Sequence, residues 1–273
     1  MKRSNRLIAI TNHFISNPKQ LIQLAHFSET YSASKSSISE DLDIVDEMFQ
    51  YEGIGYLDRI AGAAGGVMYV PFYSKEKSSS FINDLCKQLE DPERILPGGY
   101  LYMSDLLGNP ALMRKIGHIF ATAFSQLEID VIVTVATKGI SLANAIAFHL
   151  NVPVVTVRRD PKVTEGSSVS INYVSGSSRK IQTMVLPKRS LQEGANVCIV
   201  DDFMKAGGTI TGMKSLLDEF NANVKAIGVL AEAEDEEDER VVIDYTSLVQ
   251  IKNVNSVKQI IETHPGNIVD QWI

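Results

Sequence analysis

The sequence predicts an α/β protein with a mainly parallel sheet, preceded by a smaller module of helices and a hairpin. Three observations lead to this prediction. From residue 129 onward, short apolar segments alternate with segments whose apolar residues recur at helical spacing, which is typical of parallel strands covered by helices. Before residue 73, successive helical patterns give way to strand-like residues around a glycine-rich turn. The length of 273 residues suffices for one large domain or two modest ones.

The N-terminal module is predicted from the order of its elements. Helical spacing over residues 7–14 marks a first helix, which the pair Asn17-Pro18 ends. Residues 21–25 mark a second, short helix, and residues 38–49 carry an apolar face for a third. Two short strands follow within residues 54–73. This order predicts a winged helix-turn-helix domain in which the start of the third helix faces DNA.

Basic and hydroxyl side chains gather near the N-terminus. The formal net charge of −7 argues against nucleic-acid binding by the average surface of the chain, but the cations are unevenly distributed. Residues 1–36 contain a single acidic residue, Glu29. The residues predicted to contact DNA are Lys2, Arg3, Arg6, Lys19, Lys35, Ser36, Ser37, Ser39 and, on the wing, Arg59. An alternative stays open, in which the helices form a dimerisation hood that binds no DNA and the serines only cap a helix.

Composition favours a cytoplasmic protein without a membrane partner. No apolar run approaches the length of a membrane-spanning helix, and the basic N-terminus becomes polar at Thr11, too soon for a signal peptide. Cys86 and Cys198 are far apart in the sequence, so we expect buried, reduced thiols rather than a disulfide or a metal site. His13 and His26 lack the clustered partners that a metal centre needs. We therefore expect no metal-binding residues.

A linker and then alternating strands and helices are predicted after the hairpin. The polar stretch SKEKSSS at residues 74–80 is typical of a linker, and a helix is predicted at 81–90. We therefore divide the chain into residues 1–73 and residues 74–273. The strands expected in the second part are 130–136, 153–159, 195–202 and 224–233, with helices at 141–150 and 209–220. The polar insertion at 160–189 is of a length that is usually either functional or disordered.

Two adjacent carboxylates, Asp201 and Asp202, stand at the end of a predicted strand. In open α/β sheets, ligands bind beyond the carboxyl ends of the strands. The turn at 205–209 opens a helix, and its glycines, with Lys205 and Thr209, suit a phosphate. The aspartates suit hydroxyl groups, or Mg²⁺ held through further ligand atoms. The pattern favours a phosphorylated sugar over a nucleoside triphosphate or a dinucleotide, because the Walker and GxGxxG motifs are absent from the sequence. A purely structural acidic strand end stays open as the alternative.

The stretch VCIVDDFMKAGGTITG at 197–212 resembles the phosphoribosyl-diphosphate (PRPP) motif of type I phosphoribosyltransferases. The resemblance implies that Asp201 and Asp202 bind the ribose hydroxyls. Further ligand contacts that it implies are Lys205, Ala206, Gly207, Gly208 and Thr209 for the 5′-phosphate, Thr137, Lys138 and Gly139 in a diphosphate loop, and Arg158, Arg159 and Lys162 beside a mobile flap at 160–189. The segment 96–110, with Tyr102, resembles the start of the core in xanthine phosphoribosyltransferases. Ala206 stands where many active enzymes have Thr, and no residue is evident as a base-activating acid, so no catalytic residue is assigned.

Taken together, the order of modules and the stretches at 162–178 and 200–209 resemble the purine operon regulators of Gram-positive bacteria. This resemblance implies a homodimeric transcription factor that binds double-stranded promoter DNA and senses PRPP through a domain without demonstrated transferase activity. It implies no required cofactor, with PRPP as the effector and Mg²⁺ as an optional companion. The sequence leaves open the sign of the PRPP effect. Two alternatives are an active, xanthine-type purine phosphoribosyltransferase with an N-terminal extension and a DNA-binding protein with an empty pocket.

Overall fold

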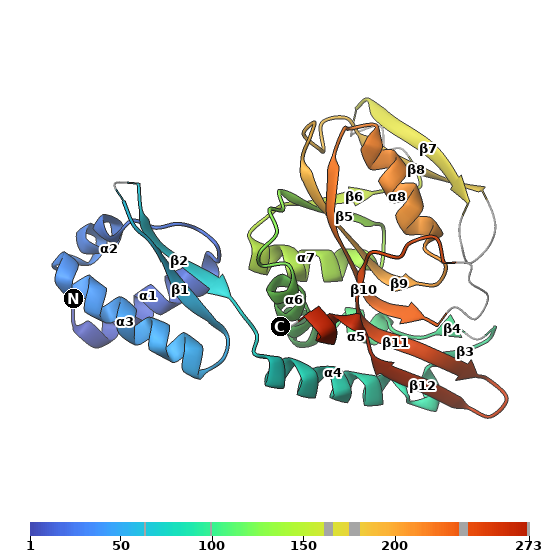
Figure 1. The fold of residues 1–273 in the computed structure, drawn as a ribbon, viewed down its shortest axis with the longest axis horizontal. Helices are drawn as coiled ribbons and strands as arrows, with labels where there is room; N and C mark the ends of the chain where they lie inside the picture. The colour runs from blue at the N-terminus through green and yellow to red at the C-terminus, as the bar shows by residue number, and fades with distance from the viewer. Residues whose placement is uncertain (63, 99, 161–165, 175–180, 235–239, 272–273) are drawn as a thin grey trace.

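A computed structural model describes residues 1–62, 64–98, 100–160, 166–174, 181–234 and 240–271. Figure 1 shows an N-terminal module of helices and a hairpin beside a larger α/β core, with the chain passing between them after β2. The predicted fold class is confirmed: a mainly parallel sheet with helices on its faces, preceded by a winged-helix module.

The N-terminal module has its own hydrophobic core. Helices α1 (Arg3–Ser16), α2 (Leu24–Tyr31) and α3 (Lys35–Tyr51) pack against the antiparallel strands β1 (Gly55–Ile60) and β2 (Gly66–Pro71). Ile10, Phe14, Phe27, Ile38 and Leu42 are fully buried within this core. These residues recur at helical spacing in the sequence, so periodicity alone was enough to locate α1 and α3.

Two details of this region differ from the sequence predictions. The second helix begins at Leu24 rather than near residue 21, because Ile22 instead pairs with Val67 of β2: its N–H donates to the Val67 carbonyl (2.9 Å) and its carbonyl accepts from the Val67 N–H (2.8 Å). The stretch 74–80 is a helix and not a linker, since α4 spans Lys75–Leu89. Ser74 caps α4 by accepting a hydrogen bond from the Lys77 N–H at 3.4 Å.

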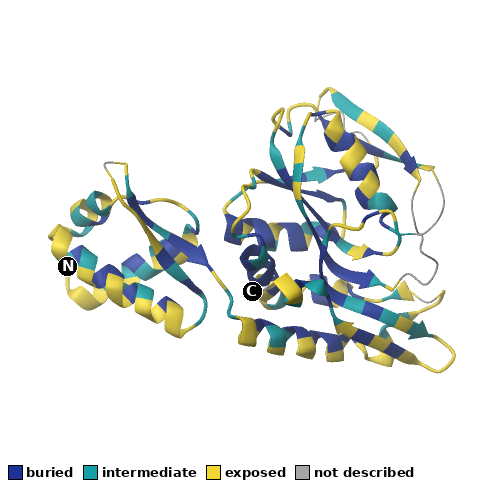
Figure 2. Ribbon diagram, viewed as in Figure 1, coloured by how far each residue is buried: buried dark blue, intermediate teal, exposed yellow. Residues whose placement is uncertain are grey.

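The core sheet has the strand order β12-β11-β10-β9-β5-β6. All neighbouring strands are parallel except β11 and β12, which are antiparallel. The strands are β5 (Val131–Val135), β6 (Val154–Val157), β9 (Asn196–Met204), β10 (Asn223–Ala233), β11 (Thr246–Asn255) and β12 (Ile260–Pro265). Figure 2 shows that the middle of this sheet is buried. The four strands predicted from apolar runs are therefore present, whereas β11 and β12 were not predicted.

Helices cover both faces of the sheet. On one face, α4, α6 (Pro110–Ala123) and α7 (Gly139–Leu150) pack against Ile132, Cys198 and Leu230. On the other, α8 (Gly208–Asp218) packs against Val133 and Ile199. Successive strand residues point to opposite faces, so a strand buried on both sides is apolar at most of its positions. This explains the apolar run at residues 197–200 and the run at 131–135, in which the buried Thr134 is the one polar residue.

The remaining short elements complete the larger part of the chain. They are the turns of 3-10 helix η1 (Pro92–Arg94) and η3 (Asn267–Gln271), strands β3 (Ile95–Leu96) and β4 (Tyr100–Leu101), and helix α5 (Ser104–Leu107). Both cysteines are buried and free, as predicted. Within the described ranges, the helices are too short or too polar to cross a membrane.

The polar insertion at 160–189 contains a hairpin with a buried face. Strands β7 (Ser168–Val174) and β8 (Ile181–Pro187) pair in antiparallel register. Tyr173, Met184 and Leu186 are buried against the cluster that includes α8, although the insertion as a whole is polar. Residues 161–165 and 175–180 lie outside the described residues. The predicted flap thus has a packed base formed by β7 and β8.

Candidate functional site

The carboxyl ends of β5, β6 and β9 bring several predicted residues together. A cleft of about 930 Å³ is lined by Lys138, the pair Asp201 and Asp202, and the turn 205–209. A neighbouring pocket of about 560 Å³ is lined by residues 135–138 and 158–160 and shares Lys138, Asp201, Asp202 and Thr209 with the cleft. Segments from three different parts of the chain therefore meet around the carboxylate pair, as expected for the edge of a parallel sheet.

Burial dominates the electrostatics of the carboxylate pair. Asp201 is only 7% exposed, and Asp202 is half-buried. Desolvation, followed by repulsion from Asp202, raises the pKa of Asp201 well above its usual value. Burial also raises the pKa of Asp202, while the charge of Lys138 opposes that shift. Two adjacent carboxylates suit a ligand whose hydroxyl groups donate hydrogen bonds to them, because each such bond favours the ionised form of the carboxylate.

The turn after β9 has the geometry of an anion site. Gly207 adopts a left-handed conformation (φ +86°), and α8 begins at the next residue. The first turn of α8 contains no acidic residue, and Gly208, Thr209 and Ile210 at its start line the cleft, so the positive end of the helix dipole lies at the cleft wall. Lys205 is exposed beside the turn, and Thr209 is half-buried on the lining of both cavities. This arrangement suits a phosphate group.

The loop between β5 and α7 lies opposite this turn. Thr137 and Lys138 are exposed and line the smaller pocket, and the peptide bond between Ala136 and Thr137 is cis. Gly139 starts α7 directly behind the strand, where an added Cβ would lie 2.2 Å from the Thr134 hydroxyl. Only glycine fits this close approach, which lets the exposed pair 137–138 project into the pocket.

The remaining predicted ligand contacts have different outcomes. Arg158 and Arg159 both line the smaller pocket, and the backbone of Arg158 pairs with Val185 of β8. Lys162 lies outside the described residues. Tyr102 is not among the described residues that line the cleft, whereas Tyr100 is. The backbone of Tyr102 binds Arg94, whose carbonyl accepts from the Tyr102 N–H (2.8 Å) and whose Nη1 donates to the Tyr102 carbonyl (3.0 Å).

One wall of the cleft was not predicted from the sequence. It comes from the end of β11 and comprises Ile251, Lys252, Asn253 and Val254. The β-branched residues Val249, Ile251 and Val254 within the stretch 249–255 are typical of a strand, although their alternation breaks at Asn253, so β11 could have been predicted from local composition. Its position next to β10, and hence its place on the cleft, follows only from the strand order.

The predicted DNA-contacting arginines all form ion pairs within the protein, and one of them is buried. Arg6 is buried and forms an ion pair with Asp41, whose side chain is fully buried, so the prediction that Arg6 faces DNA is wrong. Arg3 also donates to Asp41 (2.9 Å) but is half exposed. Arg59 pairs with Asp43 of α3. Asp41 lies next to the acidic residues Glu40 and Asp43 in the sequence, but its side chain is turned inward from α3, and a buried carboxylate requires cationic partners.

Lys19 is also placed differently from the prediction. Its Nζ donates to the carbonyl of Ser125 in the core (2.8 Å), and burial lowers its pKa. Lys19 therefore joins the two parts of the chain rather than facing solvent.

The start of α3 keeps an exposed polar surface. Lys2, Lys35 and Ser36 are exposed, while Ser37 and Ser39 are half-buried. Ser34 is the N-cap: its hydroxyl accepts from the Ser37 N–H at 3.2 Å. Helix α3 thus presents its N-terminus, Lys35 and several hydroxyls to solvent, which is the chemistry that phosphate and base-edge contacts use.

Comparisons with known proteins agree with this architecture. A family described as bacterial purine repressor, N-terminal, matches residues 2–71, and the phosphoribosyl transferase domain family matches residues 103–261. The adenine phosphoribosyltransferase of Thermoanaerobacter pseudethanolicus has the same fold as the core, with a TM-score of 0.53 and 22% identity over 61% of this chain and 98% of that one. The core is therefore a phosphoribosyltransferase fold.

Several relatives match along nearly the whole chain, and two of them illustrate the range of identity. The purine biosynthesis transcriptional repressor PurR of Bacillus subtilis is 56% identical over 268 residues, which is 98% of this chain and 94% of that protein. The purine biosynthesis transcriptional activator PurR of Lactococcus lactis subsp. lactis is 44% identical over 268 residues, 98% of each. With both domains matched in the same order, the chain belongs to the PurR family of bacterial purine regulators.

Proposed function

We propose that this protein is a DNA-binding transcriptional regulator of purine biosynthesis genes that senses PRPP. The observation that carries the proposal is the meeting of Asp201 and Asp202, the turn 205–209 and the loop 137–139 around one cleft. The names of the relatives in Bacillus subtilis and Lactococcus lactis supply the gene class. We place the boundary between the DNA-binding and sensing domains at residue 73, between the end of β2 and the start of α4.

PRPP fits the chemistry of the cleft. Its vicinal hydroxyls would donate to Asp201 and Asp202, and its 5′-phosphate would accept from the N–H groups of the turn 205–209. Its diphosphate would meet Lys138, Arg158 and Arg159. The function requires no cofactor. Mg²⁺ can accompany PRPP because the carboxylates and the phosphate oxygens are the oxygen ligands that this ion prefers.

We propose that the domain senses PRPP without transferring its phosphoribosyl group. Ala206 gives the phosphate turn one hydroxyl fewer than a threonine would, while leaving the backbone donors in place. The rival function is an active xanthine-type phosphoribosyltransferase. A diphosphate-release assay with each purine base separates the two, since a regulator that only binds PRPP releases no diphosphate above the rate without protein.

We also propose that two copies of the chain act together on DNA in the cytoplasm. Helices α1 and α3 expose Ile8, Ile44 and Met48 next to a shallow groove of about 450 Å³. An apolar surface of this kind is typical of an interface. Its burial in a homodimer would set the spacing of the two α3 helices on double-stranded promoter DNA.

The direct test is a gel shift with purine-gene promoter DNA, with and without PRPP. We expect a specific complex whose midpoint moves when PRPP is added. Relatives carry both the repressor and the activator name, so the proposal does not depend on the direction of the shift. Absence of a specific complex at low salt would reject DNA binding, and an unmoved midpoint at saturating PRPP would reject sensing.

A further inference from the structure

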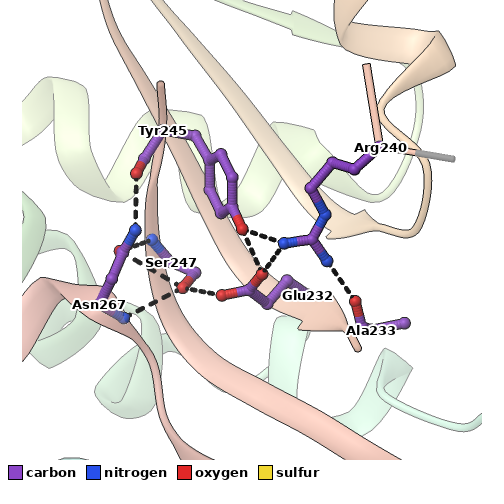
Figure 3. A network of polar contacts seen from close by, with 6 residues as sticks. All are labelled: Glu232, Ala233, Arg240, Tyr245, Ser247 and Asn267. Carbon is purple, nitrogen blue, oxygen red and sulfur yellow. Dashed lines mark hydrogen bonds and ion pairs between the residues drawn. The ribbon is translucent and has the colours of Figure 1, made fainter. Parts of the chain in front are cut away.

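A buried polar network lies behind the phosphate turn (Figure 3). Its centre is Glu232 near the end of β10, which is 4% exposed. On one side its carboxylate accepts from Arg240 Nη1 (2.5 Å) and from the Tyr245 hydroxyl. On the other side it accepts from the Ser247 hydroxyl (2.5 Å), which also contacts Asn267. The network is well matched in charge because a buried carboxylate meets one guanidinium and two hydroxyl donors.

Arg240 connects this network to the backbone at the end of β10. Its guanidinium donates to the Glu232 carboxylate, to the Tyr245 hydroxyl and, through Nη2, to the carbonyl of Ala233 (2.5 Å). Ala233 itself lines the cleft. Arg240 therefore fastens the segment 240–245 to the end of β10, at the wall of the ligand cleft.

The fastened segment supports the phosphate turn directly. The Val241 N–H donates to the Ala206 carbonyl (3.0 Å). The Val242 side chain is buried, and a Cβ added to Gly207 would lie 2.8 Å from Val242 Cγ2. Residues 241 and 242 thus hold the peptide groups around Ala206 and Gly207, whose orientation decides where the N–H groups at the start of α8 point.

We propose that Arg240 is a positioning residue for the anion-binding turn: by fixing residues 241–242 against Ala206 and Gly207, it sets the affinity of the cleft for the phosphate end of its ligand. This inference rests on the proposed PRPP function. Backbone donors bind an anion strongly only when they are held in place before the ligand arrives. Arg240 does not touch the ligand in this proposal, and its effect passes through the backbone of the turn.

The test compares Arg240→Lys with Ser247→Ala. The lysine keeps a positive charge beside Glu232 but cannot donate to Glu232, Tyr245 and Ala233 together. Ser247→Ala is the matched control, because it removes a hydrogen bond from the same carboxylate on the side away from the turn. Calorimetry measures the binding of PRPP, ribose 5-phosphate and inorganic diphosphate to each full-length protein. Thermal unfolding is measured alongside.

We expect Arg240→Lys to weaken PRPP and ribose 5-phosphate by the same factor, about tenfold, which is the equivalent of one hydrogen bond to a charged group. Diphosphate, which lacks the 5′-phosphate, should bind as before. Ser247→Ala should lower the melting temperature while leaving all affinities within error. Should Arg240→Lys not fold, the double variant Arg240→Met with Glu232→Gln removes both charges and is measured against Glu232→Gln alone.

Three results would overturn the inference. They are unchanged ribose 5-phosphate affinity in a folded Arg240 variant, equal weakening of diphosphate, and equal weakening by Ser247→Ala, which would make the network general support for β10 and β11. If the unaltered protein binds PRPP, these results count against the role of Arg240 alone. If it binds none of the phosphate ligands, the proposed function fails and the inference fails with it.

Discussion

Asp201 and Asp202 are individually unfavourable for stability and together define the candidate site. The fold buries the first carboxylate almost completely and places the second beside it. Groups of this kind are common where a ligand supplies the missing partners, because the protein alone gains nothing from burying two like charges. The ion pair of Arg6 with Asp41 is the opposite case, since there the partner is built into the chain.

The carboxylate pair leads to a prediction about stability and pH. Asp201→Asn should abolish PRPP binding and should stabilise the ligand-free protein at pH 7 by about 1 kcal/mol, as is common when a strained functional group is removed. The folded-state pKa of Asp201 is raised above its unfolded value, so the charge opposes folding at pH values above that unfolded value. The advantage of the variant over the unaltered protein should therefore shrink as pH falls through the raised pKa. Urea unfolding between pH 7 and pH 4 measures this difference.

A variant that is less stable than the unaltered protein at pH 7, or an advantage that grows as pH falls, would contradict this assignment. Asp202→Asn is the control. Its effect on stability should be smaller because Asp202 is less buried and Lys138 opposes its shift.

Gly207 allows a second prediction. Gly207→Ala should destabilise the protein and weaken the binding of phosphate ligands, because alanine would have to adopt φ +86° and contact Val242. Gly194→Ala is the control that measures the cost of the left-handed backbone alone, since Gly194 has φ +76° and nothing lies within 4 Å of the added Cβ. We expect roughly 1 kcal/mol for Gly194→Ala from the left-handed backbone, and a larger loss for Gly207→Ala. Denaturant unfolding compares the two, and equal losses would show that Val242 yields without cost.

Among the elements, α3 combines a buried charge with an exposed N-terminal end, which we propose to face DNA. The Arg6–Asp41 pair joins α1 to α3 inside the module, whereas Lys35 and Ser36 lie at the exposed N-terminus of α3. The two kinds of cation should therefore respond differently to mutation. Structure and DNA affinity can be separated within this one helix.

Mutations on α1 and α3 test that separation. Arg6→Met should destabilise the module by about 3–5 kcal/mol, because it leaves the fully buried carboxylate of Asp41 without its closest partner. Lys35→Ala should leave the melting temperature unchanged. It should weaken promoter binding and reduce the slope of log affinity against log salt by about one, the effect of one lost phosphate contact. A salt slope that Lys35→Ala does not change would remove Lys35 from the interface.

Across the whole molecule, the winged-helix module and the core are tied by direct contacts. The Lys19 ammonium donates to the Ser125 carbonyl, and the Tyr73 N–H donates to the Thr122 hydroxyl at 2.8 Å. His118 of α6 stacks on His149 of α7 with ring centroids 4.5 Å apart and packs against Tyr73. Helix α7 begins at Gly139 in the candidate diphosphate loop and ends at this joint, so one rigid element connects the cleft to the contact with the DNA-binding module.

These contacts between the two domains lead to a prediction about the coupling of PRPP binding to DNA binding. If PRPP changes DNA affinity by some factor, DNA must change PRPP affinity by the same factor, with a typical coupling of about 1–3 kcal/mol. Calorimetric titration of PRPP into the free protein and into the operator complex measures it. Lys19→Met, which removes one tie, should reduce the coupling and leave PRPP affinity of the free protein unchanged. Identical PRPP affinities with and without DNA would show that the two sites are independent.

Local sequence patterns were sufficient to predict several helices of the N-terminal module, four strands of the core and the residues proposed to bind the ligand. The periodicity of α1, α3 and the apolar strands, and the motif around Asp201 and Asp202, depend on neighbouring residues, so they can be predicted without a fold. Residues 74–80 show the limit of such patterns, since a polar helix face and a linker have similar compositions.

Only the tertiary structure decided which charged residues face solvent and which segments meet. Arg6, Lys19 and Lys35 are all cationic, and no local pattern separates the first two from the exposed Lys35. The partners of Arg6 and Lys19 are Asp41 and Ser125, which lie 35 and 106 residues away in the sequence. The cleft wall from β11 and the support of Ala206 and Gly207 by Val241 and Val242 depend on strand order and on the path of the chain after β10. Burial and long-range pairing are properties of packed surfaces, and packing is set by the whole chain rather than by any stretch of it.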